Sequence, residues 1–232
     1  MRTVALVLAA GRGERLGHPL PKGLVPVDGR PLLLHALEAL GAVEEVDLLI
    51  PVVPADAFTR FEQALAAAGP KGRLAAAVAG GRERQDSVRA GLAALPADAG
   101  LVAVHDAARP CVRPEAVRRV IEAARASGAA ILATPVRDTI KRVAAGRVVE
   151  TPPRAECWAA QTPQVFRVEI LREALAKADA DGTVGTDDAQ LVEALGVAVR
   201  VVPGDADNLK ITVPEDLATA ERLLALRSRG SR

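Results

Sequence analysis

The sequence predicts one α/β domain over residues 1–232, with a mostly parallel sheet, helices on both faces and a β-hairpin arm inserted at about residues 136–158. Three observations carry this prediction. Short apolar stretches alternate with amphipathic helical stretches as far as about residue 135, which is typical of a parallel sheet. The first apolar stretch ends in a glycine-rich loop. At residue 136 the alternation gives way to two short stretches around a glycine turn.

The first predicted strand is the apolar run Val4–Ala10, which is short and partly β-branched, as buried parallel strands are. A turn at Asp28–Pro31 follows it and places a proline near the start of the first helix. The later elements repeat this order, with apolar residues on one face of each helix. We expect strands at 46–53, 74–79, 101–104, 130–133 and 199–202, and helices at 32–40, 55–68, 85–95, 114–126 and 186–195.

The second half also contains the arm and the last helix. A helical pattern returns after Thr162–Phe166, and the spacing of Thr212 and Glu215 predicts a capping box before a last helix from Pro214 to about Leu226. An isolated two-stranded hairpin is only marginally stable in water. We therefore expect the arm to pack on a second copy of the protein, as a homodimer.

The composition excludes several classes of protein. A net charge of +1 argues against a general nucleic-acid binder, and no apolar run approaches the roughly 20 residues of a membrane helix. The two cysteines, Cys111 and Cys157, form no disulfide framework and lack the spacing of a metal site. We expect a cytoplasmic protein that acts on a small molecule.

The loop after the first strand has the chemistry of a phosphate site. Gly11 and Gly13 allow close backbone approach, so that bare N–H groups can hold phosphate oxygens. Arg15 and Lys22 add a bidentate fork and a mobile point charge. Three other interpretations compete: a signal peptide, a dinucleotide-binding fingerprint and a merely structural loop. Charges directly after the run oppose the first, and the absence of an acid at the end of the second strand opposes the second.

Carboxylates near strand ends are the metal candidates. Right-handed crossovers bring the strand-end loops to one side of the sheet, so the glycine loop, Gly80-Gly81 and Asp106 should converge. Asp106 is the best magnesium ligand; a salt bridge to Arg109 or a helix cap is the alternative. Asp207 is either a second ligand or part of a turn.

Two polar side chains beside these loops have open roles. Ser87 either caps the helix after Gly80-Gly81 or contacts a base or sugar. His105 is expected to be structural rather than a catalytic base. The sequence contains no nucleophile elbow with a Ser/His/Asp signature, so hydrolase chemistry is discarded.

Several motifs together resemble one family. Residues 8–15 with Pro21-Lys22 are similar to the signature of nucleotidyltransferases that act on sugar phosphates. The blocks at 80–88, 104–110, 135–141, 162–164 and 206–212 narrow the resemblance to the 2-C-methyl-D-erythritol 4-phosphate cytidylyltransferase family of the non-mevalonate isoprenoid pathway. The resemblance covers nearly the whole chain, and the His-Asp-Ala-Ala-Arg-Pro and Pro-Val-Arg-Asp-Thr blocks are its most specific parts.

The resemblance implies a role for each matching residue. Asp106 would hold Mg²⁺, and Arg154 at the end of the arm would reach the neighbour's site in a homodimer. CTP would be bound by Ala9, Ala10, Gly11, Gly13, Gly81, Ser87 and Asp106. The charged phosphates would be stabilised by Arg15, Lys22 and Lys210, and the sugar-alcohol phosphate would be surrounded by Arg109, Thr139, Arg154, Thr162 and Lys210. Arg82 stands where the family often has an acidic residue.

The implied reaction is in-line attack of the acceptor phosphate on the α-phosphorus of CTP, with pyrophosphate leaving. Such chemistry needs positioning and positive charge rather than a general base. Two other functions stay open: a cytidylyltransferase for a pentitol phosphate such as ribitol 5-phosphate, and a catalytically silent nucleotide-binding regulatory module. Intact Arg15, Lys22 and Asp106 argue against the silent module.

Overall fold

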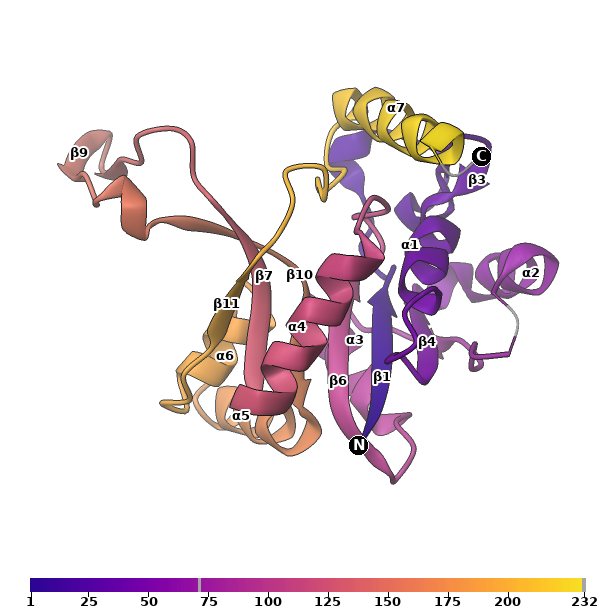
Figure 1. Cartoon of the computed structure of the whole chain (residues 1–232), viewed down its shortest axis with the longest axis horizontal. Helices are drawn as coiled ribbons and strands as arrows, with labels where there is room; N and C mark the ends of the chain where they lie inside the picture. The colour runs from indigo at the N-terminus through magenta and orange to yellow at the C-terminus, as the bar shows by residue number, and fades with distance from the viewer. Residues whose placement is uncertain (71, 231–232) are drawn as a thin grey trace.

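A seven-stranded sheet forms the centre of the molecule (Figure 1). The computed structural model describes residues 1–70 and 72–230. In spatial order the strands are β11 (Arg200–Pro203), β7 (Ala129–Pro135), β10 (Trp158–Arg167), β6 (Ala99–Asp106), β1 (Arg2–Leu8), β4 (Leu48–Val53) and β5 (Val78–Ala79). β10 runs antiparallel to both of its neighbours, and the other pairs in this sheet are parallel. The predicted mostly parallel α/β sheet is confirmed.

Helices cover both faces of this sheet, because successive side chains of each strand point to opposite sides. In β1, Ala5 and Val7 belong to one buried cluster, and Leu6 and Leu8 to the other. The first cluster includes side chains of α1 (Leu32–Gly41), α2 (Phe58–Ala68) and α4 (Pro114–Ser127). The second includes side chains of α3 (Arg84–Ala93), α5 (Val168–Ala180) and α6 (Asp188–Glu193). The central strands are therefore apolar on both sides.

A third buried cluster lies away from the sheet, under the last helix. It joins α7 (Pro214–Gly230) to the segment after the glycine loop and contains Leu16, Val25, Leu32 and Ile211. The segment itself consists of the short helices η1 (Glu14–Leu16) and η2 (Lys22–Leu24) and the strands β2 (Pro26–Val27) and β3 (Arg30–Pro31). A further short helix, η3 (Ala55–Ala57), precedes α2. This packing holds the loop of Lys22 and the segment of Lys210 in one body.

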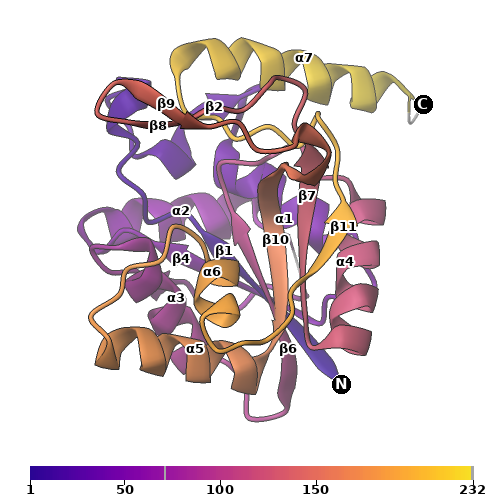
Figure 2. The same cartoon turned by 90° about the vertical axis from the view of Figure 1, so that its left-hand side faces the viewer.

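The arm is the antiparallel pair β8 (Arg142–Ala144) and β9 (Arg147–Glu150), as predicted. It projects from the sheet near the end at which α7 lies (Figure 2). The turn uses Ala145 and Gly146, both with positive φ. Val143 and Val148 are 57% and 58% exposed, and η4 (Arg154–Glu156) returns the chain to β10. The two valines are cross-strand partners, and the hairpin presents both of them largely to solvent.

Three local predictions need correction. β10 is a long strand, whereas the sequence indicated only a helix after Phe166. Polar residues buried in its middle interrupt the apolar pattern of a strand. In the stretch 74–79, only Val78–Ala79 form a named strand, with one further bridge from Leu74 to Leu49. The prediction of a capping box between Thr212 and Glu215 is wrong. The carboxylate of Asp216 instead accepts hydrogen bonds from the backbone N–H groups of Thr212 and Val213.

Within residues 1–70 and 72–230, no helix combines the length and apolarity that a membrane crossing requires.

Candidate active site

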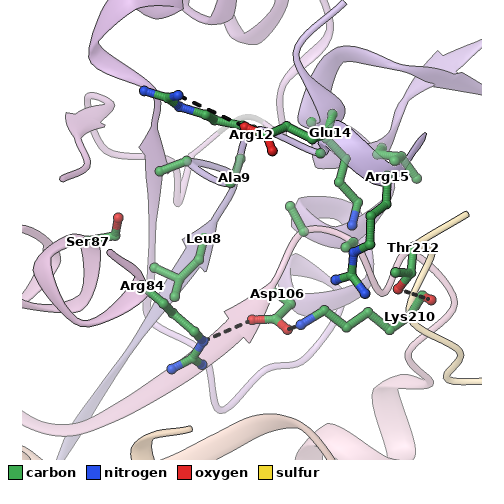
Figure 3. A pocket seen from close by; sticks show the side chains of 18 of the residues that line it. Leu8, Ala9, Arg12, Glu14, Arg15, Arg84, Ser87, Asp106, Lys210 and Thr212 are labelled. Carbon is green, nitrogen blue, oxygen red and sulfur yellow. Dashed lines mark hydrogen bonds and ion pairs between the residues drawn. The ribbon is translucent and has the colours of Figure 1, made fainter. Parts of the chain in front are cut away.

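A cavity of about 550 Å³ opens at the carboxyl ends of β1 and β6 (Figure 3). Its size is within the range of small-molecule sites. Four parts of the chain, far apart in sequence, supply most of its walls. They are the glycine loop with Lys22 and Gly23, the start of α3 with the loop before it, the end of β6, and the segment of Lys210 and Thr212. The predicted convergence of strand-end loops is confirmed.

The glycine loop forms one wall of this cavity. Ala9, Ala10, Gly11, Gly13 and Arg15 all line it. Gly13 has a φ of 70°, and a Cβ atom there would lie 2.6 Å from Cβ of Lys22. Only glycine therefore allows the stem of Lys22 to pass beneath the loop.

Gly81 and Ser87 line the opposite wall. The hydroxyl of Ser87 accepts a hydrogen bond from the backbone N–H of Gly81 at 3.2 Å and can donate to the carbonyl of Glu83 at 3.3 Å. The helix start is capped instead by Asp86, whose carboxylate accepts from the backbone N–H of Glu83. Ser87 therefore fixes the glycine pair and is not the side-chain cap of α3.

Positive charge is concentrated on one side of the cavity. Burial, together with the nearby ammonium of Lys210, lowers the pKa of Lys22 from 10.5 to about 8. The Nζ atom of Lys210 lies 2.7 Å from Oδ2 of Asp106. Lys210 is thus paired with Asp106, whereas Lys22 is held at a lowered pKa by burial and by the charge of Lys210, so an incoming polyphosphate would stabilise the charged form of Lys22.

Asp106 is the last residue of β6 and is only 7% exposed. Its Oδ1 lies 3.5 Å from Nε of Arg84. Burial alone would raise its pKa, but Arg84 and Lys210 outweigh burial and hold the pKa of this carboxyl well below its usual range. The carboxylate is therefore ionised, and its ion-pair partners are Arg84 and Lys210 rather than Arg109.

One buried, ionised carboxylate fits a magnesium ion that takes most of its ligands from phosphate and water. Within the part of the chain that the structure describes, no group of three or more His, Cys, Asp or Glu residues could hold a metal. The structure also separates the second candidate from this carboxylate. Asp207 lies in a turn, its Oδ2 is 2.7 Å from Nη2 of Arg113, and it lines neither of the two cavities described here. The turn interpretation of Asp205–Asn208 is the one observed.

A second, smaller cavity of about 250 Å³ adjoins the first, and Arg84, Asp106 and Lys210 line both. Arg109 and Thr162 also line it. The guanidinium of Arg109 donates to the carbonyls of Asn208 at 2.7 Å and Ala160 at 3.2 Å. The Thr162 hydroxyl accepts from the backbone N–H of Asp106 at 3.0 Å. Three of the five predicted acceptor residues are thus brought together.

The other two predicted acceptor residues, Thr139 and Arg154, lie on the arm and line neither cavity of their own chain. Both are exposed, and Arg154 donates a hydrogen bond to the carbonyl of Arg137. The structure therefore does not bring these two residues together with Arg109, Thr162 and Lys210.

His105 has the structural role that we expected. Its side chain is fully buried between the hydroxyl of Thr162, 3.1 Å from Nδ1, and the carbonyl of Arg109, 3.2 Å from Nε2. Burial lowers its pKa to about 4. A neutral histidine with both ring nitrogens engaged is not available as a base.

Sequence reasoning missed Arg84 as a site residue. It lies at the first position of α3, and its Nη1 is 2.8 Å from Oδ2 of Asp188, the first residue of α6. Asp188 is 1% exposed, and its burial raises its pKa, which Arg84 opposes. The sequence signal that could have identified Arg84 is its position. It is the third charged residue in a row after Gly80-Gly81, at the start of a helix that was expected to lie beside the glycine loop.

The fold and the site together define a class, namely α/β proteins that bind a nucleotide's phosphates beyond the carboxyl ends of parallel strands. The profile of the 2-C-methyl-D-erythritol 4-phosphate cytidylyltransferase family matches residues 3–226. The chain therefore belongs to this family.

Individual relatives agree with that assignment. Proteins of the same name from Desulforamulus reducens and Synechococcus sp. WH7803 are 41% and 47% identical. The first match covers 97% of both chains, and the second covers 96% of this chain and 99% of the relative.

Two solved structures extend the agreement to the fold. The 4-diphosphocytidyl-2C-methyl-D-erythritol synthase from Anaerococcus prevotii is 32% identical, with a TM-score of 0.86 over 97% of this chain and 96% of that one. The cytidylyltransferase from Thermus thermophilus is 39% identical, with a TM-score of 0.78 over 96% of this chain and 98% of that one.

Proposed function

We propose that the chain transfers a cytidylyl group from CTP to 2-C-methyl-D-erythritol 4-phosphate and releases pyrophosphate, as a step of non-mevalonate isoprenoid biosynthesis. The observation that carries the proposal is a two-compartment site in a member of this family. A larger cavity beneath the glycine loop adjoins a smaller one lined by Arg109 and Thr162, with Lys210 and Asp106 between them. We also propose a cytoplasmic location, which agrees with the free thiols of Cys111 and Cys157.

The larger cavity suits the nucleotide. Backbone around Ala9, Ala10, Gly11 and Gly13 would hold the phosphates, while Gly81 and Ser87 would contact the cytidine. The smaller cavity suits the acceptor phosphate, which Arg109, Thr162 and Lys210 would bind. This arrangement lets the acceptor oxygen approach the α-phosphorus on the side opposite the leaving pyrophosphate.

The chemistry requires charge stabilisation more than proton transfer. Negative charge grows on the leaving pyrophosphate in the transition state, and Arg15 and Lys22 beside the glycine loop would stabilise it. The lowered pKa of Lys22, about 8, would rise on nucleotide binding, so the ammonium form is retained where charge develops. A phosphate monoester is already nucleophilic at neutral pH, and neither cavity is lined by a histidine.

Asp106 would hold a magnesium ion together with the phosphates of CTP. The ion, when bound, would neutralise phosphate charge and help to orient the α-phosphate. Lys210, which contacts Asp106 in the ligand-free protein, would then become free to bind the acceptor phosphate.

The test is a panel of nucleotides and acceptors with pyrophosphate release as the readout. CTP with 2-C-methyl-D-erythritol 4-phosphate and Mg²⁺ should react, and ATP or GTP should react far more slowly. Equal turnover with ribitol 5-phosphate, or none with the methylerythritol compound, would overturn the assignment of the acceptor. CTP binding without transfer to any acceptor would favour the silent regulatory module.

The arm supports a homodimer in which Arg154 completes the acceptor site of the partner. Its exposed valines need cover, and Arg154 reaches neither cavity of its own chain. Lys22, by contrast, lines its own nucleotide cavity. The variants Lys22→Ala and Arg154→Ala should therefore be nearly inactive alone and should complement each other when refolded together.

Random pairing makes about half of the dimers mixed, and one of the two sites in each mixed dimer carries neither substitution. About a quarter of wild-type activity should then return, measured against wild type refolded in parallel. Activity no higher than the mean of the two variants, in a mixture shown by native mass spectrometry to contain mixed dimers, would place Arg154 in its own chain's site.

A further inference from the structure

Arg84 forms ion pairs with two carboxylates, and the two distances differ. Its Nη1 lies 2.8 Å from Oδ2 of Asp188, whereas its Nε lies 3.5 Å from Oδ1 of Asp106. The shorter contact has the length of a charge-assisted hydrogen bond, and the longer one does not. The contact of Arg84 with Asp188 is thus the tighter of the two, and the longer contact with Asp106 is drawn in the close-up of the cavity (Figure 3).

Asp188 is a fixed anchor for this contact. It is 1% exposed, and the backbone N–H groups of Asp188 and Ala189 both donate to Oε1 of Gln164 at 3.1 Å. Gln164 lies in β10, opposite Val104 in β6, two residues before Asp106. The anchor and the carboxylate of the active site are therefore held by neighbouring strands.

The length of the contact between Arg84 and Asp106 affects how easily a cation can bind this carboxylate. A guanidinium that closed fully on this carboxylate would form a second tight ion pair beside the one with Lys210. Both oxygens would then be occupied, and a divalent cation would have to displace two partners rather than one. By retaining Arg84, Asp188 keeps the contact between Arg84 and Oδ1 of Asp106 at 3.5 Å, so a cation would have to displace only Lys210 from a tight ion pair.

We propose that Asp188 and Arg84 are positioning residues of the reaction, in which Asp188 restrains Arg84 from masking the carboxylate of Asp106. This inference rests on the proposed role of Asp106 as a magnesium ligand. The pair acts through Asp106, and Asp188 itself lines neither of the two cavities.

The experiment measures how strongly Mg²⁺ tightens CTP binding. Isothermal calorimetry on the full-length protein gives the Kd of CTP with excess Mg²⁺ and with EDTA, and the ratio of the two is the metal coupling. Asp188→Asn keeps the shape of the side chain and removes its charge, so Arg84 is released toward Asp106. The metal coupling should fall about tenfold, as for loss of a partner that orients a metal ligand. The affinity for CTP in EDTA should not fall, because Asp188→Asn removes a negative charge and leaves the positive charge of Arg84 less neutralised beside the cavity.

The decisive variant is the double substitution Arg84→Gln with Asp188→Asn. It removes the masking cation together with its anchor and leaves no unpaired buried charge, so the metal coupling should return to at least the wild-type value. A merely structural role for Asp188 would instead leave the double variant as impaired as the single one. That result, or unchanged coupling in Asp188→Asn, would overturn the proposal. Should Asp188→Asn fail to fold, a fall in coupling in the double variant would overturn it equally.

Arg89 provides the matched control. It lies on the same helix, is 30% exposed against 28% for Arg84, and is likewise shared between two carboxylates, Asp86 and Asp179. It lines neither cavity. Asp179→Asn should therefore leave the metal coupling unchanged, and a comparable fall there would overturn the specific role of Asp188.

A reference variant separates this inference from the function on which it rests. Asp106→Asn should abolish the metal coupling. If it does not, Asp106 is not the metal ligand, and both its proposed role and the positioning role of Asp188 and Arg84 fail. If it does while Asp188→Asn has no effect, only the positioning role is wrong.

Discussion

The replacement of Lys22 by methionine should make the ligand-free protein more stable while it removes most of the activity. Burial and Lys210 lower the pKa of Lys22 from 10.5 to about 8, so the folded protein holds this ammonium at a cost. At 1.36 kcal/mol for each tenfold change in proton affinity, that cost is at most about 3.4 kcal/mol. Lys22 is only partly buried, and solvent screening reduces the cost to about 1 kcal/mol.

Methionine keeps the apolar stem under Gly13 and removes the charge. The free energy of unfolding should therefore rise by about 1 kcal/mol, which raises Tm by about 2–4 °C for a chain of this size. Turnover should fall about 10²- to 10³-fold, as for loss of one preorganised charge at a transition state. Thermal unfolding without ligand and pyrophosphate release measure the two effects.

The dependence on pH is the control. The pKa of Lys22 is lower in the folded protein than in the unfolded chain. The free-energy cost of holding its ammonium is therefore fully present below about pH 8, and it disappears as the pH rises toward 10.5, where the unfolded chain also loses this proton. The difference in Tm between the variant and wild type should therefore shrink over this interval. A variant that is less stable than wild type by a margin independent of pH would refute the electrostatic reasoning and would assign Lys22 a packing role.

Two further variants test the geometry of the site. Asp106→Asn should keep the fold and lose metal-dependent turnover, and a Mg²⁺ titration indistinguishable from that of wild type would show that the metal is held elsewhere. Gly13→Ala should lower the free energy of unfolding by about 1–3 kcal/mol, because it combines a positive φ with a Cβ atom 2.6 Å from that of Lys22, and it should also lower turnover by moving this lysine. Unchanged Tm and turnover would mean that the loop adapts without displacing Lys22.

The part of the site that could be predicted from the sequence follows from the order of strands and loops. Apolar strands that end in glycine, or in Asp106, must place those ends together once the sheet is parallel and its crossovers are right-handed. For that reason the glycine loop, Gly80-Gly81 and Asp106 were predicted to converge, and the glycine loop, Gly81 and Asp106 line one cavity.

What could not be predicted depends on partners that come from distant parts of the chain. The contact between Arg84 and Asp188 exists because β10 and α6 bring Asp188 to the start of α3, and no spacing rule indicates such a pair. β10 itself was missed because Gln161, Thr162 and Gln164 are buried polar residues, whose hydrogen bonds to Asn208, Asp106 and Asp187 are visible only in the folded chain. The hairpin arm was predictable from its turn, because a glycine between two short β-branched stretches favours an antiparallel pair.

The most direct test of the central claim is ³¹P NMR of the wild-type protein with CTP, 2-C-methyl-D-erythritol 4-phosphate and Mg²⁺. If the acceptor phosphate attacks the α-phosphorus, the signal of the acceptor monoester should give way to the two coupled doublets of an asymmetric diphosphate diester. Pyrophosphate should appear in equal amount. Formation of CMP with the acceptor monoester unchanged, or of CDP with an acceptor that carries a terminal diphosphate, would contradict the account.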